Sequence, residues 1–365
     1  MAPLPRRTEE AGIAGIRRKR NPALIGPEMF FEESDAVRAA FAQLLGSDEA
    51  ERVALLPSVS YGVAAVARNA RLEPGHEVLL TRDQFPGNVY GWMRAAGEAG
   101  ARVRFVDPPR DPDRPGERGE GWNERILEAI GPRTRVVTLG HVHWTDGTLF
   151  ALEAIGARAS QVGALLVVDG TQSIGALPFD LAAIRPDAVI CAAYKWLLGP
   201  YAQALAWMGP AFDDGVPLEE TWIAREGSRD FGALVNYRDA YAPGAVRYDV
   251  GERSNFALLP MVLASLELVL RWTPECIAAH VAGISAPLLA WAREEGWGVE
   301  HDAWRAPHMF GLRLPPGVRP GPVQEALAAR RVAVSVRGDA LRVSPHLYND
   351  EGDLEALRTA LAAVV

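Results

Sequence analysis

The chain has 365 residues, of which 48% are hydrophobic and 23% are charged, and its formal net charge is −8. This composition is typical of a globular protein and excludes a disordered, collagen-like or coiled-coil chain. The acidic balance argues against a nucleic-acid-binding protein, and no apolar run is long enough to predict a membrane span. Two cysteines, Cys191 and Cys276, exclude a disulfide framework, and the N-terminus lacks the apolar core of a secretory signal, so we expect a cytoplasmic protein.

The first 22 residues are charged and rich in arginine, and we expect a solvated segment there. A helix is predicted over Glu33–Leu45, with Ser34 as its cap. From residue 53 onward, short apolar runs alternate with Ala-rich helical segments. The runs are Val53–Leu56, Glu77–Thr81, Ala101–Val106, Arg135–Leu139, Ala164–Asp169, Ala188–Ala192 and Ala204–Met208. This alternation predicts an α/β fold with a mainly parallel seven-stranded sheet covered by helices.

The alternation of apolar runs and helical segments is absent from residues 211–250, which predicts a long loop. A loop of that length inside a domain is usually functional. Two long helices are predicted over Leu258–Trp272 and Pro274–Glu295. The C-terminal part then gives short strands and two further helices, which is typical of a smaller α+β domain. We therefore expect an N-terminal segment over 1–35 that packs with the small domain, a large cofactor-binding domain over 36–255 and a small domain over 256–365.

Two charged residues follow apolar strands of the predicted sheet. Asp169 ends one strand and Lys195 follows another, so both side chains should lie at the carboxyl edge, where ligand sites form in such sheets. Burial would lower the pKa of Lys195 toward the range in which an amine is nucleophilic. A lysine for a Schiff base and an acid for a pyridinium nitrogen are what pyridoxal phosphate needs. A structural ion pair between the two is the alternative.

The surrounding motifs are D-G-T-Q-S-x-G from Asp169 and Y-K-W-L-x-G-P from Tyr194. They resemble those of the class V aminotransferase group of fold-type I pyridoxal-phosphate enzymes, which includes cysteine desulfurases, kynureninases and isopenicillin-N-epimerase-like proteins. The resemblance implies pyridoxal 5'-phosphate as cofactor, with Lys195 as the Schiff-base lysine and Asp169 as the pyridinium partner. It also implies that Gln172 bonds the phenolic oxygen and that Tyr194 contacts the phosphate.

Three further segments match the cofactor contacts of this group. The segment that begins at Ser58 resembles its phosphate loop, so the backbone N–H groups of a helix N-terminus should face an anion; these belong to Val59, Ser60 and Tyr61. Phe85 falls where the group stacks a ring on the pyridine. Ser254 and Asn255 lie in the turn that reaches the phosphate of the neighbouring subunit. The resemblance thus implies a homodimer with a shared active site.

The substrate side of the site is implied by R-x-S-x-x-x-Y-N, from Arg342 to Asn349. Arg342 is expected to hold a substrate carboxylate bidentately, and Trp144 to lie beside the substrate. Because no cysteine lies between Leu314 and Arg342, a persulfide mechanism is not expected. We expect aminotransferase-type chemistry on a small α-amino acid. A β-eliminating lyase of the C–S lyase kind and an amino-acid racemase or epimerase remain alternatives.

Two readings from other classes stay open. His141 and His143 form an H-x-H at a strand end, as in metal-dependent hydrolases, although no further ligands follow at a matching spacing. A protein that binds pyridoxal phosphate without catalysis is the other alternative. The carboxylate-binding role implied for Arg342 argues against it. Because no further ligands follow His141 and His143 at a matching spacing, we expect no metal site.

Overall fold

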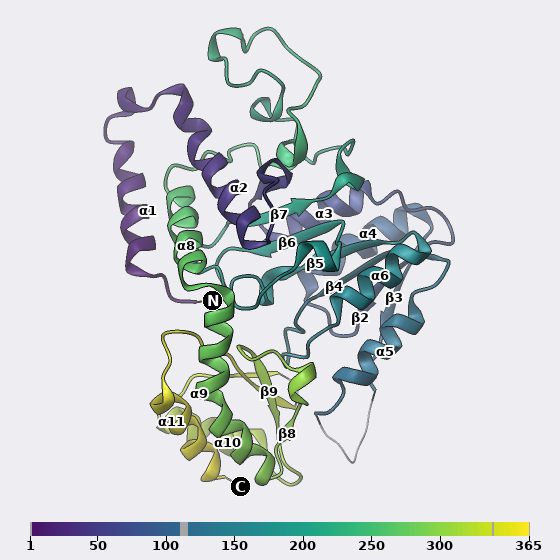
Figure 1. Ribbon diagram of the computed structural model, residues 1–365, viewed down its shortest axis with the longest axis vertical. Coiled ribbons are helices and arrows are strands. Elements are labelled where there is room, and N and C mark those ends of the chain that lie inside the picture. The colour runs from purple at the N-terminus through teal and green to yellow at the C-terminus, as the bar shows by residue number, and fades with distance from the viewer. Residues whose placement is uncertain (1, 110–115, 338, 365) are drawn as a thin grey trace.

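The computed structural model describes residues 2–109, 116–337 and 339–364. A twisted sheet with helices on both faces forms the large domain, and a smaller domain lies at one end of it (Figure 1). The strands of the large sheet are β1 (Val53–Leu56), β2 (Glu77–Thr81), β3 (Arg102–Val106), β4 (Thr134–Gly140), β5 (Leu165–Asp169), β6 (Ala188–Ala192) and β7 (Ala204–Met208).

The strand order is β1-β7-β6-β5-β4-β2-β3, and only β7 runs antiparallel to its neighbours β1 and β6. The expected α/β fold with a mainly parallel seven-stranded sheet is confirmed. Because β4, β5 and β6 are parallel and adjacent, their carboxyl ends meet at one edge of the sheet. Residues that follow these three strands are thereby brought together.

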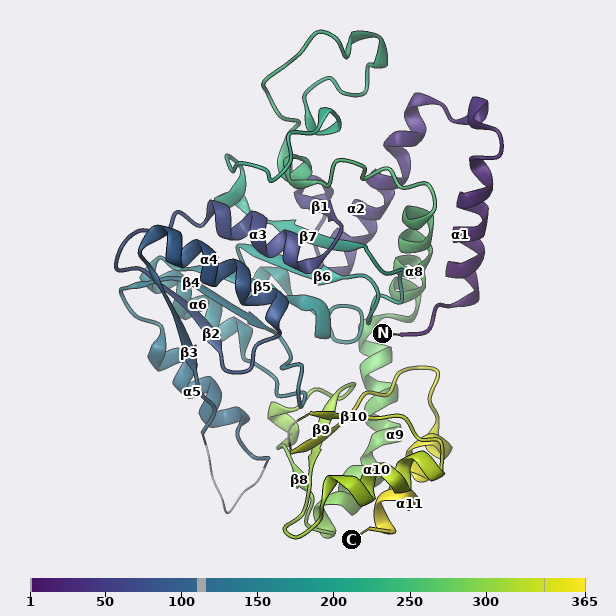
Figure 2. The same cartoon turned by 180° about the vertical axis from the view of Figure 1, so that it is seen from behind.

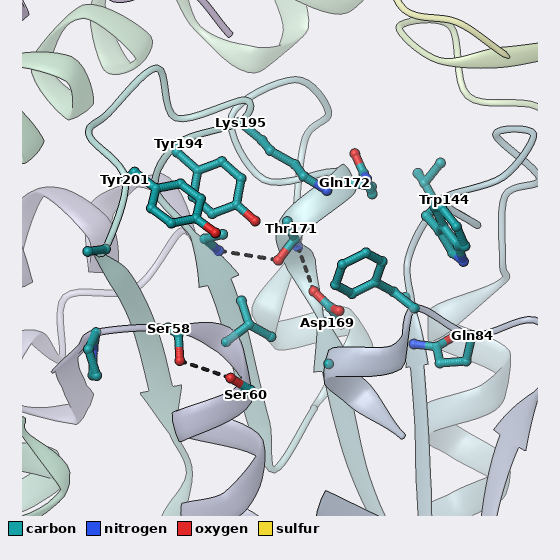
Figure 3. A pocket seen from close by; sticks show the side chains of 18 residues that line it. Ser58, Ser60, Gln84, Trp144, Asp169, Thr171, Gln172, Tyr194, Lys195 and Tyr201 are labelled. Atoms are coloured by element: carbon teal, nitrogen blue, oxygen red, sulfur yellow. Dashed lines mark hydrogen bonds between the residues drawn. The ribbon is translucent and has the colours of Figure 1, made fainter. Parts of the chain in front are cut away.

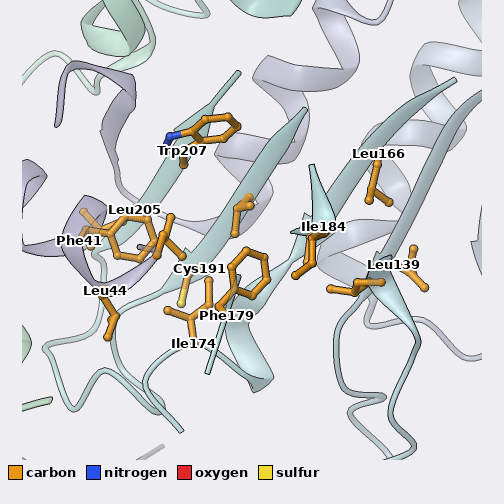
Figure 4. Packing of buried hydrophobic residues seen from close by; sticks show 14 of the residues in the cluster. Phe41, Leu44, Leu139, Leu166, Ile174, Phe179, Ile184, Cys191, Leu205 and Trp207 are labelled. Carbon is orange, nitrogen blue, oxygen red and sulfur yellow. The ribbon is translucent and has the colours of Figure 1, made fainter. Parts of the chain in front are cut away.

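Alternate residues of each strand face opposite layers. In β6, Val189 and Cys191 belong to one core cluster, whereas Ala188 and Ile190 belong to the other. The first cluster also holds buried residues of α2 (Glu32–Leu44), α5 (Gly119–Ala129), α6 (Leu152–Val162) and α8 (Leu258–Trp272), and Figure 4 shows part of it. The second cluster packs under α3 (Val59–Asn69) and α4 (Tyr90–Ala99), on the face seen in Figure 2. A short helix, α7 (Leu181–Ile184), precedes β6.

The N-terminal segment differs from the expected solvated arm. Arg6–Arg18 form a helix, α1, that lies alongside α8 (Figure 1). Gly12 packs against Met261 and Gly15 against the Phe256 carbonyl, so a Cβ atom at either glycine would clash. The following helix α2 begins at Glu32 after Phe31, and Ser34 is buried inside it rather than capping it.

The small domain has its own core around a four-stranded sheet of order β10-β11-β9-β8. Its elements are α9 (Pro274–Glu294), β8 (Gly298–Val299), β9 (Phe310–Arg313), α10 (Pro320–Ala329), β10 (Ser335–Arg337), β11 (Ala340–Val343) and α11 (Glu351–Ala362). This core begins at Ile284, whereas α8 packs into the large-domain core. The packing therefore places the boundary inside α9 instead of at 255/256. By length and composition α9 alone among the described helices could cross a membrane, yet its inner side packs in this core.

The long loop over 211–250 contains short helical turns and extends away from the sheet (Figure 1). Its arginines are held within the loop or against α2. Arg225 pairs with Glu220 and lies over the Tyr241 ring, and Arg229 pairs with Asp35. Neither arginine lines the cavity described next.

Candidate active site

A cavity of about 220 Å³ opens at the carboxyl edge of the large sheet. It is lined by residues that follow β1, β2, β4, β5 and β6, so five strand ends contribute to one space (Figure 3). The expected residues in its wall are Val59, Ser60, Phe85, Trp144, Asp169, Gln172, Tyr194 and Lys195. The structure therefore brings together most residues that the sequence singles out, although they span more than a hundred positions of the chain.

Asp169 ends β5, and its position is fixed by the turn that follows. Its Oδ1 accepts a hydrogen bond from the Thr171 N–H at 3.1 Å, while the Thr171 hydroxyl accepts one from the Ala192 N–H at 3.2 Å. Thr171 thus ties the end of β5 to the end of β6. Burial raises the pKa of the Asp169 carboxyl, and the Thr171 hydrogen bonds and the Lys195 charge oppose this rise.

Lys195 lies in the tight turn after β6. Leu198 donates its N–H to the Lys195 carbonyl at 3.1 Å and adopts a left-handed φ of 57°, which is strained for a leucine. Gly175, the last residue of the Asp169 motif, has φ 96° and packs against the Trp196 carbonyl, where a Cβ atom would clash. The two motifs therefore fit against each other through backbone that only glycine allows.

The Lys195 amine points into the cavity. Its Nζ lies 5.4 Å from the centroid of the Phe85 ring, which also contacts Trp144 edge-on at 5.4 Å. Burial lowers the pKa of Lys195, and Asp169 opposes this effect, whereas the charges of Arg342 and Arg337 add to it. The site therefore favours a neutral, nucleophilic amine near an aromatic wall.

The N-terminus of α3 forms the opposite end of the cavity. Ser58 caps the helix: its Oγ accepts a hydrogen bond from the Tyr61 N–H at 3.1 Å. This corrects the expectation that Tyr61 offers a free N–H, because the cap occupies it and Tyr61 does not line the cavity. Val59 and Ser60 do line it, and the Ser60 hydroxyl lies 3.0 Å from that of Ser58. A helix N-terminus with hydroxyl groups is suited to a phosphate.

Tyr194 lies near this end of the cavity together with Tyr201. Their rings are 4.6 Å apart, and both hydroxyl groups face the interior of the cavity in Figure 3. Burial raises the pKa of Tyr194, so its hydroxyl stays protonated and can donate a hydrogen bond. Tyr201 is a wall residue that the sequence analysis misses, as are Gln84 and Thr171. The strand-end position of Gln84 and Thr171 is the signal that would have found them.

Gln172 is held from behind by Trp196, whose Nε1 donates to its Oε1 at 3.0 Å. Its backbone carbonyl lies 2.6 Å from Nε2 of the fully buried His308. The Trp196 ring is in turn packed edge-on against His308 and stacked on His346. Since Oε1 is occupied, the amide offers its NH₂ group to an acceptor in the cavity.

A second cavity of about 80 Å³ adjoins the first and shares Gln172 and Lys195 with it. Arg342 lines this cavity and donates from one terminal nitrogen to the Trp144 carbonyl at 2.7 Å. Its buried Nε has no partner among the described residues. Trp144 is itself fixed by a 2.6 Å hydrogen bond from Nε1 to the Asp83 carbonyl. The guanidinium thus has unused donors that face a space large enough for a small carboxylate.

Ser254 and Asn255 do not reach either cavity within this chain. The Ser254 hydroxyl donates to the Phe30 carbonyl at 2.6 Å, and the Asn255 side chain accepts from the N–H groups of Ala257 and Leu258. Both line a separate cavity of about 440 Å³ beside α1. Their expected role on a neighbouring subunit stays a prediction.

The two histidines of the H-x-H motif are held by contacts within the protein. His143 lies 3.1 Å from the Arg82 carbonyl and 2.7 Å from the Thr145 hydroxyl, and the half-buried His141 packs edge-on against Phe179. Within the described ranges, no three histidine, cysteine or acidic side chains are grouped so that they could hold a metal ion. The geometry gives the alternative of a metal-dependent hydrolase no support.

Pyridoxal phosphate, the cofactor expected from the resemblance, fits the residues present. Asp169 is a buried carboxylate without a basic side chain at ion-pair distance among the described residues, and a protonated ring nitrogen would neutralise it. Val59 and Ser60 would hold the phosphate, Gln172 the phenolic oxygen and Lys195 the aldehyde carbon, while Phe85 would cover the ring. Each donor or acceptor that the cofactor offers thus has a complementary group in the cavity wall.

Comparisons with known proteins agree with this fit. Residues 28–205 match the family model described as aminotransferase class-V. The chain is 26% identical to an isopenicillin N epimerase of Streptomyces clavuligerus over 90% of the chain and 83% of that protein. It is 27% identical to an uncharacterized aminotransferase, YcbU, of Bacillus subtilis over 91% of the chain and 84% of that protein. Among solved structures, the cystine C–S lyase C-DES in complex with cysteine persulfide superposes with a TM-score of 0.81 at 22% identity, covering 99% of this chain and 95% of that one.

Proposed function

Because the chain belongs to the class V aminotransferase group of pyridoxal-phosphate enzymes, we propose that it transfers the amino group of a small α-amino acid to a 2-oxo acid. One observation carries this proposal: the half-buried Lys195 lines both the cavity that contains Asp169 and the adjoining cavity that contains Arg342, and among the described residues it supplies the only side-chain amine in the wall of the first. The bound cofactor supplies an electron-accepting ring that stabilises negative charge at the substrate Cα.

The residues of the chain then have separate tasks. Arg342 binds the substrate carboxylate and thereby places Cα near Lys195, with which it shares the smaller cavity. The pKa of Lys195 is lowered by burial, so the free amine could take the proton from Cα and deliver it, on the same face, to the cofactor carbon that bears the amino nitrogen. Asp169 would keep a positive charge on the ring nitrogen. The donor amino acid leaves as its 2-oxo acid, and a second 2-oxo acid receives the amino group.

The position of the base on one face of the site favours transfer over racemisation. Inversion of configuration at Cα by two bases needs a second base on the opposite face, whereas the wall that faces Lys195 is the aromatic ring of Phe85. Neither cysteine suits the desulfurase mechanism: Cys191 is fully buried, which raises the pKa of its thiol, and the exposed Cys276 lines neither cavity of the site. A β-eliminating activity uses the same lysine and remains the second candidate, since the C–S lyase C-DES shares the fold.

A panel of amino acids tests this proposal. Each amino acid is added to the cofactor-loaded protein without a 2-oxo acid, and the absorbance of the cofactor and the released products are followed. Transfer predicts that the cofactor is converted to its amine form with one equivalent of 2-oxo acid. Continuous release of 2-oxo acid and ammonia with the cofactor unchanged would show elimination instead, and loss of optical rotation alone would show racemisation.

A further inference from the structure

Arg342, which lines the smaller cavity of the active site, is one of two arginines on the same face of the small-domain hairpin. The strands β10 and β11 pair with Ser335 opposite Arg342 and Arg337 opposite Ala340. Directly paired residues of antiparallel strands share a face, and so do residues two positions apart. Arg337 is therefore on the same face as Arg342, as its diagonal neighbour.

This face is turned toward the large domain. The residues between them, Val336 and Leu341, pack into the core of the small domain on the other side of the hairpin. On β9, Gly311 is paired with Arg342, and a Cβ atom at Gly311 would press on Asp146 of the large domain. The arginine face thus lies against the loop that holds Trp144.

Both arginines contact the same tryptophan of the cavity wall. Arg342 donates to the Trp144 carbonyl, and the guanidinium carbon of Arg337 lies 5.4 Å from the centroid of the Trp144 ring. Trp144 also packs against Phe85, beside which the Lys195 amine lies. Arg337 is therefore at the rim of the space in which a substrate side chain would lie.

The charge of Arg337 is not neutralised locally. Arg313 lies on the same face and forms ion pairs with Asp146 and Asp339. In contrast, among the residues that the structure describes, no carboxylate lies at ion-pair distance from Arg337 or Arg342. The positive charge of Arg337 also lowers the pKa of Lys195, after the larger effect of burial, so its field reaches the reacting amine.

We propose that Arg337 is a specificity residue that binds a second carboxylate, so that the substrate is an α-amino acid whose side chain ends in a carboxylate. The assignment rests on the proposed function, in which Arg342 holds the α-carboxylate. Two guanidinium groups on one hairpin face then bracket a dicarboxylic amino acid, one at each end, with Trp144 between them. A neutral side chain would leave Arg337 without a charged partner among the described residues.

Pairs of ligands that differ in charge but hardly in size test the assignment. Glutamate and glutamine, and aspartate and asparagine, are titrated into the cofactor-loaded protein while the cofactor absorbance is followed. The wild type should bind the acid about tenfold more tightly than its amide. Arg337→Gln should abolish this preference and leave binding of glutamine and asparagine unchanged. Arg330→Gln, which removes an exposed arginine after α10 of the same domain, should keep the preference for the acid over the amide.

A second readout separates this proposal from the proposed function. Glutarate and pentanoate lack an amino group, so their binding, measured by calorimetry, depends on the arginines and not on the cofactor chemistry. Glutarate should bind more tightly than pentanoate, and Arg337→Gln should remove the difference. Equal binding of acids and amides by the wild type, or a preference that survives Arg337→Gln, would overturn the proposal for Arg337. Absorbance that responds to no amino acid, with glutarate still preferred, would contradict the proposed function alone.

Discussion

The indole nitrogen of Trp196 donates a hydrogen bond to Oε1 of Gln172 at 3.0 Å, and this bond decides which end of the Gln172 amide faces the cavity. The two residues lie in different motifs, after β5 and after β6, and meet at the back wall of the site. Because the carbonyl end is occupied, Gln172 presents its NH₂ group, which is suited to an oxyanion such as the phenolic oxygen of the cofactor.

The first prediction concerns this bond. Trp196→Phe keeps an aromatic ring but removes the donor, so the Gln172 amide is free to turn and its donation to the oxyanion weakens. We expect the pH at which the visible cofactor band titrates to shift by roughly 0.5 to 1 unit, in the same direction as in Gln172→Ala. Trp92→Phe is the matched control, because Trp92 is buried in α4 and donates to Asn88 away from the cavity. An unchanged titration in Trp196→Phe would show that the bond has no role in orienting the amide.

The second prediction concerns Arg342. Arg342→Ala should weaken the binding of amino acids by ~2–4 kcal/mol, because a charge-assisted bidentate contact is lost, while cofactor binding is retained. The shift of cofactor absorbance with ligand concentration measures both. Amines without a carboxylate provide the control and should respond alike in the two proteins. If amino acids titrate at the same concentrations in both, Arg342 does not bind the carboxylate.

The third prediction is a homodimer in which Ser254 and Asn255 serve the neighbouring site. Among the described residues of one chain, these side chains bond to Phe30 and to the start of α8 and reach neither cavity of the site. Tyr90 and Met93 of α4 are exposed apolar residues and leave a surface for a partner. Lys195→Ala and the double variant Ser254→Ala/Asn255→Ala should each be inactive or strongly impaired. Their mixture should regain part of the activity, because a hybrid dimer contains one intact site. Light scattering that shows a cofactor-bound, active monomer would refute the shared site.

The fourth prediction is a loss of stability in mild acid. Burial lowers the pKa of His346 to about 4 and that of His308 to about 3, whereas the unfolded chain has the ordinary value of about 6.5. Between these values the unfolded state binds protons that the folded state does not, so stability falls as the pH falls below about 6.5. Each histidine contributes up to ~1.4 kcal/mol per pH unit to the slope of the unfolding free energy.

His346→Phe tests this directly, since both ring nitrogens of His346 lack partners among the described residues and the ring stacks on Trp196 and Tyr348. Urea unfolding at several pH values between 7 and 5 gives the slope of the unfolding free energy against pH. This slope should be smaller in His346→Phe by the contribution of one histidine. Equal slopes in wild type and His346→Phe would mean that His346 titrates normally in the folded protein.

Much of the fold could be predicted because the strands of the large sheet are short and, apart from the edge strand β3, mostly apolar and buried. All seven strands of the large sheet lie within a residue or so of their predicted bounds, and the positions of Asp169 and Lys195 follow from the strand ends. The helix α1 could not be predicted in this way. Its closest contacts are made at Gly12 and Gly15, residues that weaken a helix by propensity but allow the close approach of α8 and of the residues just before it.

The parts of the site that escaped prediction depend on contacts between distant segments. Tyr201 is placed in the wall by the turn after Lys195, and the orientation of Gln172 depends on Trp196 and His308, which no local pattern reveals. The capping of α3 by Ser58 likewise decides that the Tyr61 N–H is not available. Residue preferences in the sequence identify candidates for such positions, and tertiary contacts determine which of them is used.

The central claim is that Lys195 carries the cofactor, and borohydride reduction followed by peptide mass spectrometry tests it most directly. The purified protein should be yellow, and reduction should bleach the visible band and leave one pyridoxyl phosphate group on Lys195. Lys19 offers an internal comparison, because it lies at the end of α1 and does not line the cavity of about 220 Å³ that contains Lys195 and Asp169. An unmodified Lys195 in a protein saturated with the cofactor would contradict the account.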